Sequence, residues 1–166
     1  MYSKIFAEWR FELKLYPSLV IYRQIVTKMY NFVWWELVQM YPKCKKPCIT
    51  MTKLVCGRNR LAINTQHEKE YEARICKYCT NNVVEDLMHF VLKCPIYDDI
   101  RNSLFCTIMC ELSYEGSMIF NRLKDQTKLL LLLGLEYPLL IEDKFILRYI
   151  SSVHINQMYK KRCSLD

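Results

Sequence analysis

Glycine and proline are scarce in this chain, and their scarcity limits the folds that it can adopt. Only 3 glycines and 5 prolines occur among 166 residues, whereas a protein of many strands needs both residue types in its turns. Apolar residues make up 52% of the chain and charged residues 25%, which is enough for a hydrophobic core and argues against wholesale disorder. We therefore expect a mostly α fold with about the length of one ordinary domain.

Apolar spacing, together with bounding prolines and glycines, predicts where the helices lie. The clearest series runs from Leu19 to Met40 in steps of three and four residues, and Pro17 precedes it. Residues 42–47 are interpreted as a basic break, and residues 58–74 show no clear period. Further helices are expected over residues 2–15, 49–55, 85–94, 96–112, 115–133 and 139–161.

Helix geometry predicts which side chains are buried in two pairs of residues that lie outside any motif. Trp34 and Trp35 are adjacent and must point to different sides of a helix. One is expected in the core and the other at the surface, where stacking on a base is an alternative to helix packing. Cys106 and Cys110 are four residues apart on a predicted helix and are expected to be core residues.

Basic residues are concentrated in the first half of the chain. Residues 1–80 contain 14 Lys and Arg against 6 Asp and Glu, a net charge of +8, whereas the remainder contains 10 against 11, a net charge of −1. Such a distribution would neutralise phosphates and give salt-sensitive binding to nucleic acid. A solvated basic face is the alternative, because a basic patch alone is a weak signal. The densest part contains no acidic residue and comprises Lys43, Lys45, Lys46, Lys53, Arg58 and Arg60.

Three cysteines and a histidine stand at the spacing of metal ligands. The pattern is Cys76-x2-Cys79-x9-His89-x4-Cys94, and residues 80–82 after the second cysteine are of turn-forming types. Three thiolates and one imidazole fill a tetrahedral Zn²⁺ and leave no position for water, so one structural zinc is predicted rather than a hydrolytic metal. The alternative is a chance pair of cysteines beside an ordinary core histidine.

The other cysteines do not suggest a disulfide framework. The chain has nine cysteines in all, an odd number at irregular spacing, so reduced thiols with some metal ligands fit better. Cys44 and Cys48 could supply half of a second metal site, but ordinary thiols are the favoured interpretation.

The segments around the metal motif occur in a recognisable order. They are Thr52–Gly57 (TKLVCG), Leu61–Thr65 (LAINT), Glu72–Cys79 (EARICKYC), Val84–Asp86 (VED), His89-Phe90, Cys94 and Arg101. Together, over about residues 50–105, they resemble the zinc-binding region at the C-terminal end of reverse transcriptases from non-LTR retrotransposons. The resemblance implies a zinc knuckle with ligands Cys76, Cys79, His89 and Cys94. It also adds Arg74, the arginine before the first cysteine pair, to the candidate nucleic-acid residues.

In that family the region follows the polymerase and helps to hold template RNA or target DNA. The spacing departs from the retroviral nucleocapsid knuckle, where four residues separate the cysteine pair from the histidine. The mode of base reading used by nucleocapsid knuckles is therefore not expected here.

No catalytic motif is recognised in the chain. The run from Pro95 to Asp99 is similar to the Tyr-x-Asp-Asp loop of reverse transcriptases, but its aromatic residue adjoins the first aspartate and the spacing fails. Two-metal catalysis also needs a further carboxylate on a palm sheet, and no such sheet is readable. Asp98 and Asp99 are interpreted as a polar helix start. A phosphate-binding loop, a Ser/His/Asp order and an HExxH motif are also missing, so we expect the chain not to be an enzyme.

These observations predict a helical domain with a small inserted zinc knuckle. Its parts are a basic, aromatic-rich helical segment (1–60), a zinc-knuckle region (61–105) and a C-terminal helical segment (106–166). The leading hypothesis is a non-catalytic, zinc-stabilised module, resembling the C-terminal part of a retrotransposon reverse transcriptase, that contacts RNA or DNA. Two alternatives remain: a scaffold that packs against a protein such as the polymerase domain without binding nucleic acid, and a degenerate retroelement remnant.

Neither a secretory signal nor a membrane span is expected. Glu8 and Glu12 fall where the apolar part of a signal would lie. The longest apolar run, Leu129 to Leu135, contains Gly134 and is far shorter than the roughly 20 residues that a bilayer requires. We therefore expect an intracellular protein without a membrane partner, and the sequence does not distinguish nucleus from cytoplasm.

Overall fold

The computed structural model describes residues 11, 14–16, 19–25, 33–65 and 70–165. These residues are mostly α-helical, which confirms the predicted fold class. An isolated antiparallel bridge between Ile75 and Val84 supplies local β pairing. The helix predicted over residues 2–15 lies almost entirely outside the described residues, as does the middle of the series predicted over 19–40.

The N-terminal part of the described chain forms a succession of short helices. They are α2 (Val20–Ile25), α3 (Val33–Met40), the 3₁₀ helix η2 (Pro42–Cys44), α4 (Lys45–Val55), α5 (Ala62–Thr65) and the 3₁₀ helix η3 (Tyr71–Arg74). As predicted, one tryptophan of the adjacent pair is buried and the other exposed: Trp34 is 1% exposed and Trp35 is 64% exposed.

The predicted basic break at residues 42–47 is only partly correct. Pro42 opens η2, but Lys45 begins α4, four residues before the helix start expected from the sequence. Pro47 lies in the first turn of α4. A proline is tolerated there because the N–H groups of the first turn have no partner within the helix.

The end of α4 is set by Gly57, which adopts a left-handed conformation with φ of +67°. Its N–H donates to the carbonyl of Leu54 at 3.2 Å, and the N–H of Arg58 donates to the carbonyl of Lys53 at 2.8 Å. These two bonds form a Schellman motif, in which glycine avoids the steric cost of a positive φ. The helix therefore ends where the chain turns towards α5.

The C-terminal part contains the longer helices. They are the π-helical turn η4 (His89–Lys93), the 3₁₀ helix η5 (Pro95–Tyr97), α6 (Asp98–Glu111), α7 (Tyr114–Arg122), α8 (Asp125–Leu132) and α9 (Ile141–Ser164). The positions of α6 and α9 agree with the predicted helices over 96–112 and 139–161. Within the described part of the chain, no helix combines the length and apolar character that crossing a membrane would need.

The single helix predicted over 115–133 is wrong, because the structure contains two helices there. Leu123 and Lys124 separate α7 from α8 with extended ψ angles of 144° and 152°. The interruption allows Phe120 of α7 and Leu132 of α8 both to be buried. Apolar residues continue through the interruption, so apolar spacing does not reveal it.

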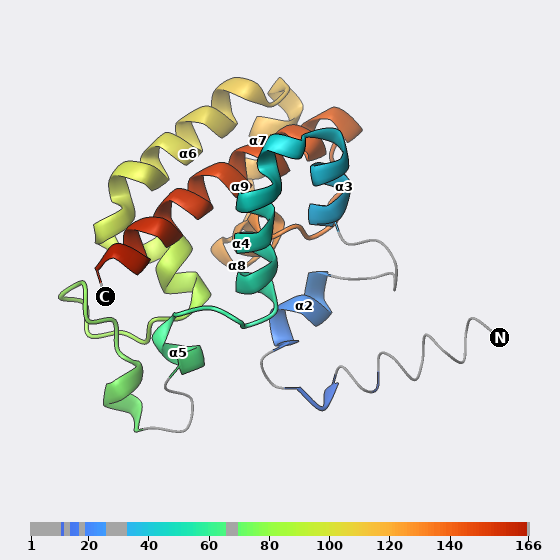
Figure 1. Cartoon of the computed structure of the whole chain (residues 1–166). Helices are drawn as coiled ribbons and strands as arrows, with labels where there is room; N and C mark the ends of the chain where they lie inside the picture. The colour runs from blue at the N-terminus through green and yellow to red at the C-terminus, as the bar shows by residue number, and fades with distance from the viewer. Residues whose placement is uncertain (1–10, 12–13, 17–18, 26–32, 66–69, 166) are drawn as a thin grey trace.

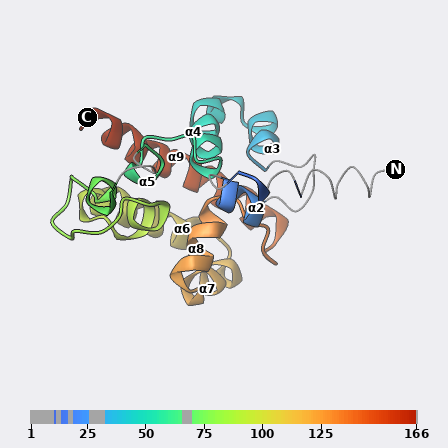
Figure 2. The ribbon, with the colours of Figure 1, turned by 90° about the horizontal axis from the view of Figure 1, so that it is seen from below.

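Helix α9 is the centre of the packing. It contacts α6 and α4 along its length and also contacts α3 and α8, and Figure 1 shows it passing between α6 and α4. Figure 2 shows α4 and the C-terminal end of α9 on one side of the molecule, with α7 and α8 on the other. The core between them includes fully buried residues from each layer, among them Leu37, Leu54, Leu104, Leu132 and Ile155. Each such side chain contributes roughly 1.5–3 kcal/mol through burial.

The expected core positions of Cys106 and Cys110 are wrong, because both side chains are exposed. The buried residues of α6 are Arg101, Leu104 and Ile108. Positions 106 and 110 lie on the other side of the helix from this face. Regular i, i+4 spacing identifies a helical face, but it does not show which face is buried.

Candidate metal centre

The structure brings Cys76, Cys79, His89 and Cys94 together. One ligand atom from each residue lies within 4.8 Å of the other three, and Cys79 Sγ lies 3.4 Å from His89 Nε2. Cys76, His89 and Cys94 are buried and Cys79 is half-buried. The four residues predicted as ligands thus form one cluster that can hold a metal ion.

The first two cysteines are positioned by a short hairpin around the Ile75–Val84 bridge. Cys76 N–H donates to the carbonyl of Val83 at 2.8 Å, and Glu85 N–H donates to the carbonyl of Arg74 at 2.9 Å. Asn82, in the turn, has a positive φ of 50°, a conformation that asparagine tolerates better than most residues. The turn predicted for residues 80–82 therefore reverses the chain directly after Cys79.

His89 and Cys94 are positioned by a π-helical turn that sequence reasoning missed. Cys94 N–H donates to the carbonyl of His89 at 2.7 Å, a bond across five residues rather than four. In an α-helix, residues five apart point about 140° away from each other, so the wider turn is what returns Cys94 to the side of His89. The His-x4-Cys spacing itself was the available signal.

The helical turn begins with a cap from Asp86. Its Oδ1 accepts the N–H of His89 at 2.7 Å, and its carbonyl accepts the N–H of Phe90 at 2.9 Å. An aspartate at this position satisfies an N–H group that has no partner within the turn. The predicted helix over 85–94 is therefore shorter than expected, because helical structure starts at Leu87.

Burial governs the electrostatics of the cluster. It raises the pKa of the Cys76 thiol and raises the pKa of Cys94 to about 12, although backbone N–H groups of Tyr78 and Ile96 bond to these sulfurs and oppose the change. Burial also lowers the pKa of His89, despite the nearby Asp86 carboxylate. At neutral pH and without a cation, the two thiols are therefore protonated and the imidazole is neutral. A bound dication would displace the thiol protons.

A buried ion pair attaches the end of α9 to the knuckle, which we define as residues 75–94. Glu85 Oε1 lies 2.5 Å from Arg162 Nε, and Glu85 Oε2 lies 3.1 Å from Arg162 Nη2. Glu85 Oε2 also accepts the N–H of Ala62 at 2.8 Å, and the Arg162 guanidinium lies 4.3 Å from the centre of the Tyr78 ring. Sequence reasoning noticed Glu85 but missed Arg162, which lies 77 residues away.

Arg101 supports the other end of the knuckle. Its Nη2 donates to the carbonyl of Cys94 and to Asp98 Oδ1, the latter at 2.6 Å. Asp98 and Asp99 lie in the first turn of α6, as predicted, and Asp99 lies 3.3 Å from Lys161 of α9. Both carboxylates therefore take part in ion pairs around the helix start.

Six of the seven predicted nucleic-acid residues lie on and around α4, whereas Arg74 lies directly before the knuckle. Lys43 lies in η2. Lys45, Lys46 and Lys53 lie on α4, and Arg58 and Arg60 follow it. All six side chains are exposed. Arg74 ends η3 and is half-buried. Among the described residues, ion pairs do not involve any of the four lysines.

Cys44 and Cys48 are both buried, away from any third ligand that the described residues provide. Burial and the neighbouring Cys44 raise the pKa of Cys48 to about 12. Cys94 has an equally raised pKa, so the missing third ligand, not the pKa, is what favours ordinary core thiols over half of a second metal site in the described part of the chain.

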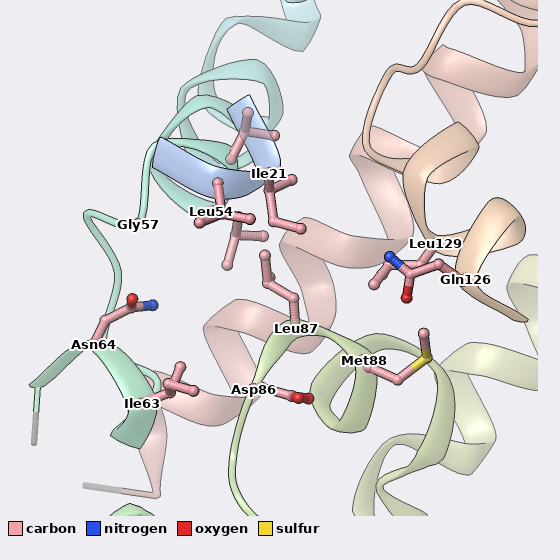
Figure 3. A pocket seen from close by; sticks show the side chains of 12 residues that line it. Ile21, Leu54, Gly57, Ile63, Asn64, Asp86, Leu87, Met88, Gln126 and Leu129 are labelled. Atoms are coloured by element: carbon pink, nitrogen blue, oxygen red, sulfur yellow. The ribbon is translucent and has the colours of Figure 1, made fainter. Parts of the chain in front are cut away.

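A cavity of about 280 Å³ opens beside the knuckle, between α2, the end of α4, α5 and the turn that precedes η4. Figure 3 shows Ile21, Leu54 and Leu87 pointing into it. Among the described residues that line it, Asp86 is the one ionisable residue, and this carboxylate already accepts the N–H of His89. The described part of the cavity wall therefore supplies no acid–base pair.

Comparisons of the chain with protein-family models, with curated proteins and with solved structures find no match. What the cluster can do therefore follows from its own chemistry. Thiolate and imidazole ligands suit zinc and other soft or borderline transition metals, whereas Mg²⁺ and Ca²⁺ prefer oxygen. A Cys₃His set supplies four ligands, the number that closes a tetrahedral site.

Proposed function

We propose that Cys76, Cys79, His89 and Cys94 hold one structural Zn²⁺ in a non-catalytic module that contacts nucleic acid. The observation that carries the metal assignment is the meeting of four ligand atoms within 4.8 Å of one another. Tetrahedral zinc with bonds of about 2.3 Å to sulfur requires sulfur atoms roughly 3.8 Å apart. A small contraction of the cluster satisfies this requirement.

Zinc in this position would cross-link two segments of the knuckle. It would connect the hairpin that bears Cys76 and Cys79 to the π-turn that bears His89 and Cys94. Structural zinc contributes apparent free energies of about 10–16 kcal/mol in small zinc modules, because the site exists only in the folded chain. All four positions would be filled, so the metal would stabilise the fold rather than activate water.

Nucleic-acid contact is supported by charge and by resemblance. The net charge of +8 in residues 1–80 includes an acid-free run of lysines and arginines on and after α4. The motif set over about residues 50–105 resembles the zinc-binding region of non-LTR retrotransposon reverse transcriptases. Two members of that set have structural roles here: Asp86 caps the turn at His89, and Arg101 binds the carbonyl of Cys94.

Metal content tests the zinc assignment. We expect elemental analysis of dialysed protein to give one zinc per chain, and we expect Cys79→Ser and His89→Ala to abolish it. Cys106→Ser is the matched control, because Cys106 is exposed on α6 and does not belong to the cluster. A well-folded protein without zinc, or a variant of His89 with full zinc, would contradict the assignment.

Salt dependence of binding tests the nucleic-acid assignment. Replacing Lys45, Lys46, Arg58 and Arg60 together with glutamine should weaken binding and flatten its dependence on salt. The logarithmic slope should fall by about 0.7–0.9 for each phosphate that the variant no longer neutralises. Arg122→Gln with Lys124→Gln is the control, because both residues are exposed, Arg122 at the end of α7 and Lys124 just before α8. Unchanged affinity and slope in the fourfold variant would contradict nucleic-acid contact through this surface.

A second candidate function, a protein-binding scaffold, is favoured by one set of exposed apolar side chains. Tyr114, Leu140 and Ile141 are 82%, 53% and 71% exposed, and larger apolar patches of this kind often mark contacts between proteins. A polymerase domain is the partner that the resemblance implies. Co-purification with a polymerase fragment that persists after nuclease treatment and in high salt would favour this function over nucleic-acid contact.

A further inference from the structure

Helix α9 lies beside the basic helix α4, and three contacts define their relative direction. The rings of Tyr41, just before α4, and Tyr149 of α9 have centroids 5.7 Å apart. Further along, the hydroxyl of Thr50 donates to Asn156 Oδ1 at 2.8 Å. The last contact joins the loop after α4 to α9: the backbone N–H of Arg60 donates to the hydroxyl of Tyr159 at 3.2 Å. These partners occur in the same order along both segments, so the two helices run in the same direction.

The outer sides of these helices carry lysines. Lys46 and Lys53 of α4 are both exposed and are seven residues apart, which places them on one face. On α9, Tyr149 and Lys160 are exposed and eleven residues apart, about three turns of one face. In the described part of the chain, none of these three lysines is in an ion pair.

Acidic residues are missing from both helices where they face each other. Helix α4 contains none, and residues 149–164 of α9 contain none. Asn156, which is 7% exposed, lies between the helices and bonds to Thr50. The buried bond between Thr50 and Asn156 therefore holds the two helices together. The exposed seam above it, between the outer faces of α4 and α9, carries ammonium groups and no carboxylate from α4 or from residues 149–164, which suits an anionic backbone.

One end of the seam offers aromatic surface. Tyr41 and Tyr149 are 43% and 45% exposed, and their rings are tilted by 55°. Stacking on exposed rings is available to unpaired bases but not to bases held inside a duplex. The distance along α9 from Tyr149 to Lys160 is about 16 Å, long enough for several nucleotides at roughly 3.4 Å each.

We propose that the seam defined by Tyr41, Lys46, Lys53, Tyr149 and Lys160 binds single-stranded nucleic acid. A base stacks on the Tyr41–Tyr149 pair, and the phosphates that follow lie against the three lysines. The proposal rests on the nucleic-acid contact proposed above, and it extends that contact to α9 and to single strands. The contribution of α9 was invisible in the sequence, because Tyr149 and Lys160 are far from α4 along the chain.

The test is fluorescence anisotropy of the zinc-supplemented full chain with a labelled 12-nucleotide oligo(dT), its oligo(U) counterpart and a 12-base-pair duplex. Tyr149→Ala should weaken binding of the single strands roughly tenfold through the loss of stacking, and it should leave duplex binding unchanged. Tyr149→Phe should bind like the unaltered chain. Lys160→Gln should weaken binding a few-fold and lower the salt slope by about 0.7.

Lys124→Gln is the charge-matched control, since Lys124 lies between α7 and α8 on the side of the molecule opposite α4 (Figure 2). Melting temperature and zinc content of each variant verify that the fold is intact. Tyr149→Ala and Lys160→Gln could bind like the unaltered chain while the variant with Lys45, Lys46, Arg58 and Arg60 replaced binds more weakly. In that case the proposed seam is wrong, but the proposed nucleic-acid contact is supported. If the unaltered chain binds none of the probes, both are wrong. Equal loss for duplex and single strand after Tyr149→Ala overturns the preference for single strands.

Discussion

The knuckle (residues 75–94) and the helical core differ in what holds them together. The core contains long helices whose fully buried leucines and isoleucines, such as Leu104 and Ile155, stabilise it by apolar burial. The knuckle contains one β bridge and one π-turn, and its central side chains are potential metal ligands. Apolar burial therefore stabilises the core, whereas the knuckle combines the burial of Phe90 and Val91 with a cluster that can hold a metal ion and a few polar bonds.

The two regions are nevertheless joined through charged residues. Glu85 pairs with Arg162 of α9, Arg101 of α6 binds the carbonyl of Cys94, and Lys93 pairs with Asp125 of α8. These contacts place the knuckle against three helices. Each can be broken separately, which makes the comparison testable.

The largest expected effect comes from breaking the buried pair between knuckle and α9. Glu85→Ala leaves Arg162 buried without its carboxylate, so we expect the free energy of unfolding to fall by about 3–5 kcal/mol. Combining Glu85→Gln with Arg162→Met should recover part of this loss, because no unpaired charge remains. Urea denaturation measures both. A loss below about 1 kcal/mol for Glu85→Ala would show that the two regions are not coupled through this pair.

A cavity in the core separates the two kinds of stability. Leu104→Ala should lower the free energy of unfolding by about 2–5 kcal/mol, since Leu104 is fully buried, while zinc content stays at one per chain. Cys106→Ser on the exposed side of the same helix should change stability by less than about 0.5 kcal/mol. Loss of zinc from folded Leu104→Ala would mean that the core, not the ligand set, determines metal binding.

Removal of the cap should affect the knuckle alone. Asp86→Ala removes the acceptor for His89 N–H and should cost about 1 kcal/mol, with a corresponding loss of roughly fivefold in zinc affinity, measured by chelator competition. Asp86→Asn retains a capping oxygen and should behave almost as the unaltered chain does. Equal zinc affinity in the alanine and asparagine variants would contradict a capping role.

The smallest effect is expected at the surface pair between Lys93 and Asp125. Lys93 holds the pKa of the Asp125 carboxyl below its usual value, so the pair stabilises the folded chain at pH above about 4, and the contribution disappears as the carboxyl is protonated at lower pH. Both side chains are about half exposed, and solvent limits the contribution to a small one. Asp125→Asn should therefore lower stability slightly at pH 7 and not at all at about pH 2. Urea denaturation at the two pH values measures the difference, and a larger loss at the lower pH would contradict this sign.

Local sequence signals were sufficient for the fold class, for the two helices α6 and α9 and for the ligand set. Scarce glycine, apolar spacing and the prolines predicted the mostly α class, and α6 and α9 lie within a few residues of their predicted bounds. The four potential ligands were predicted because metal-ligand spacing is a local property of the chain. The Trp34–Trp35 pair was resolved for the same reason: adjacent helical positions cannot share a face.

Features that depend on tertiary contacts could not be predicted. The exposed side of Cys106 and Cys110 is decided by what packs against α6, and the interruption at Leu123 and Lys124 is decided by how α7 and α8 share the core. The partner of Glu85 is Arg162, 77 residues away, and no spacing rule connects them. The π-turn was also missed, but the sequence does contain a signal for it. The His-x4-Cys spacing is incompatible with an α-helix that brings both ligands to one side.

Hydrogen exchange of individual amides, measured before and after chelation of zinc, tests the difference between the two regions most directly. The amides of Cys76, Glu85 and Cys94 form the hairpin and π-turn bonds, whereas the amide of Ile155 lies in the interior of α9. We predict that chelation removes the protection of the first three and leaves that of Ile155 largely intact. Equal protection of all four amides with and without zinc would contradict a metal-dependent knuckle on an apolar helical core.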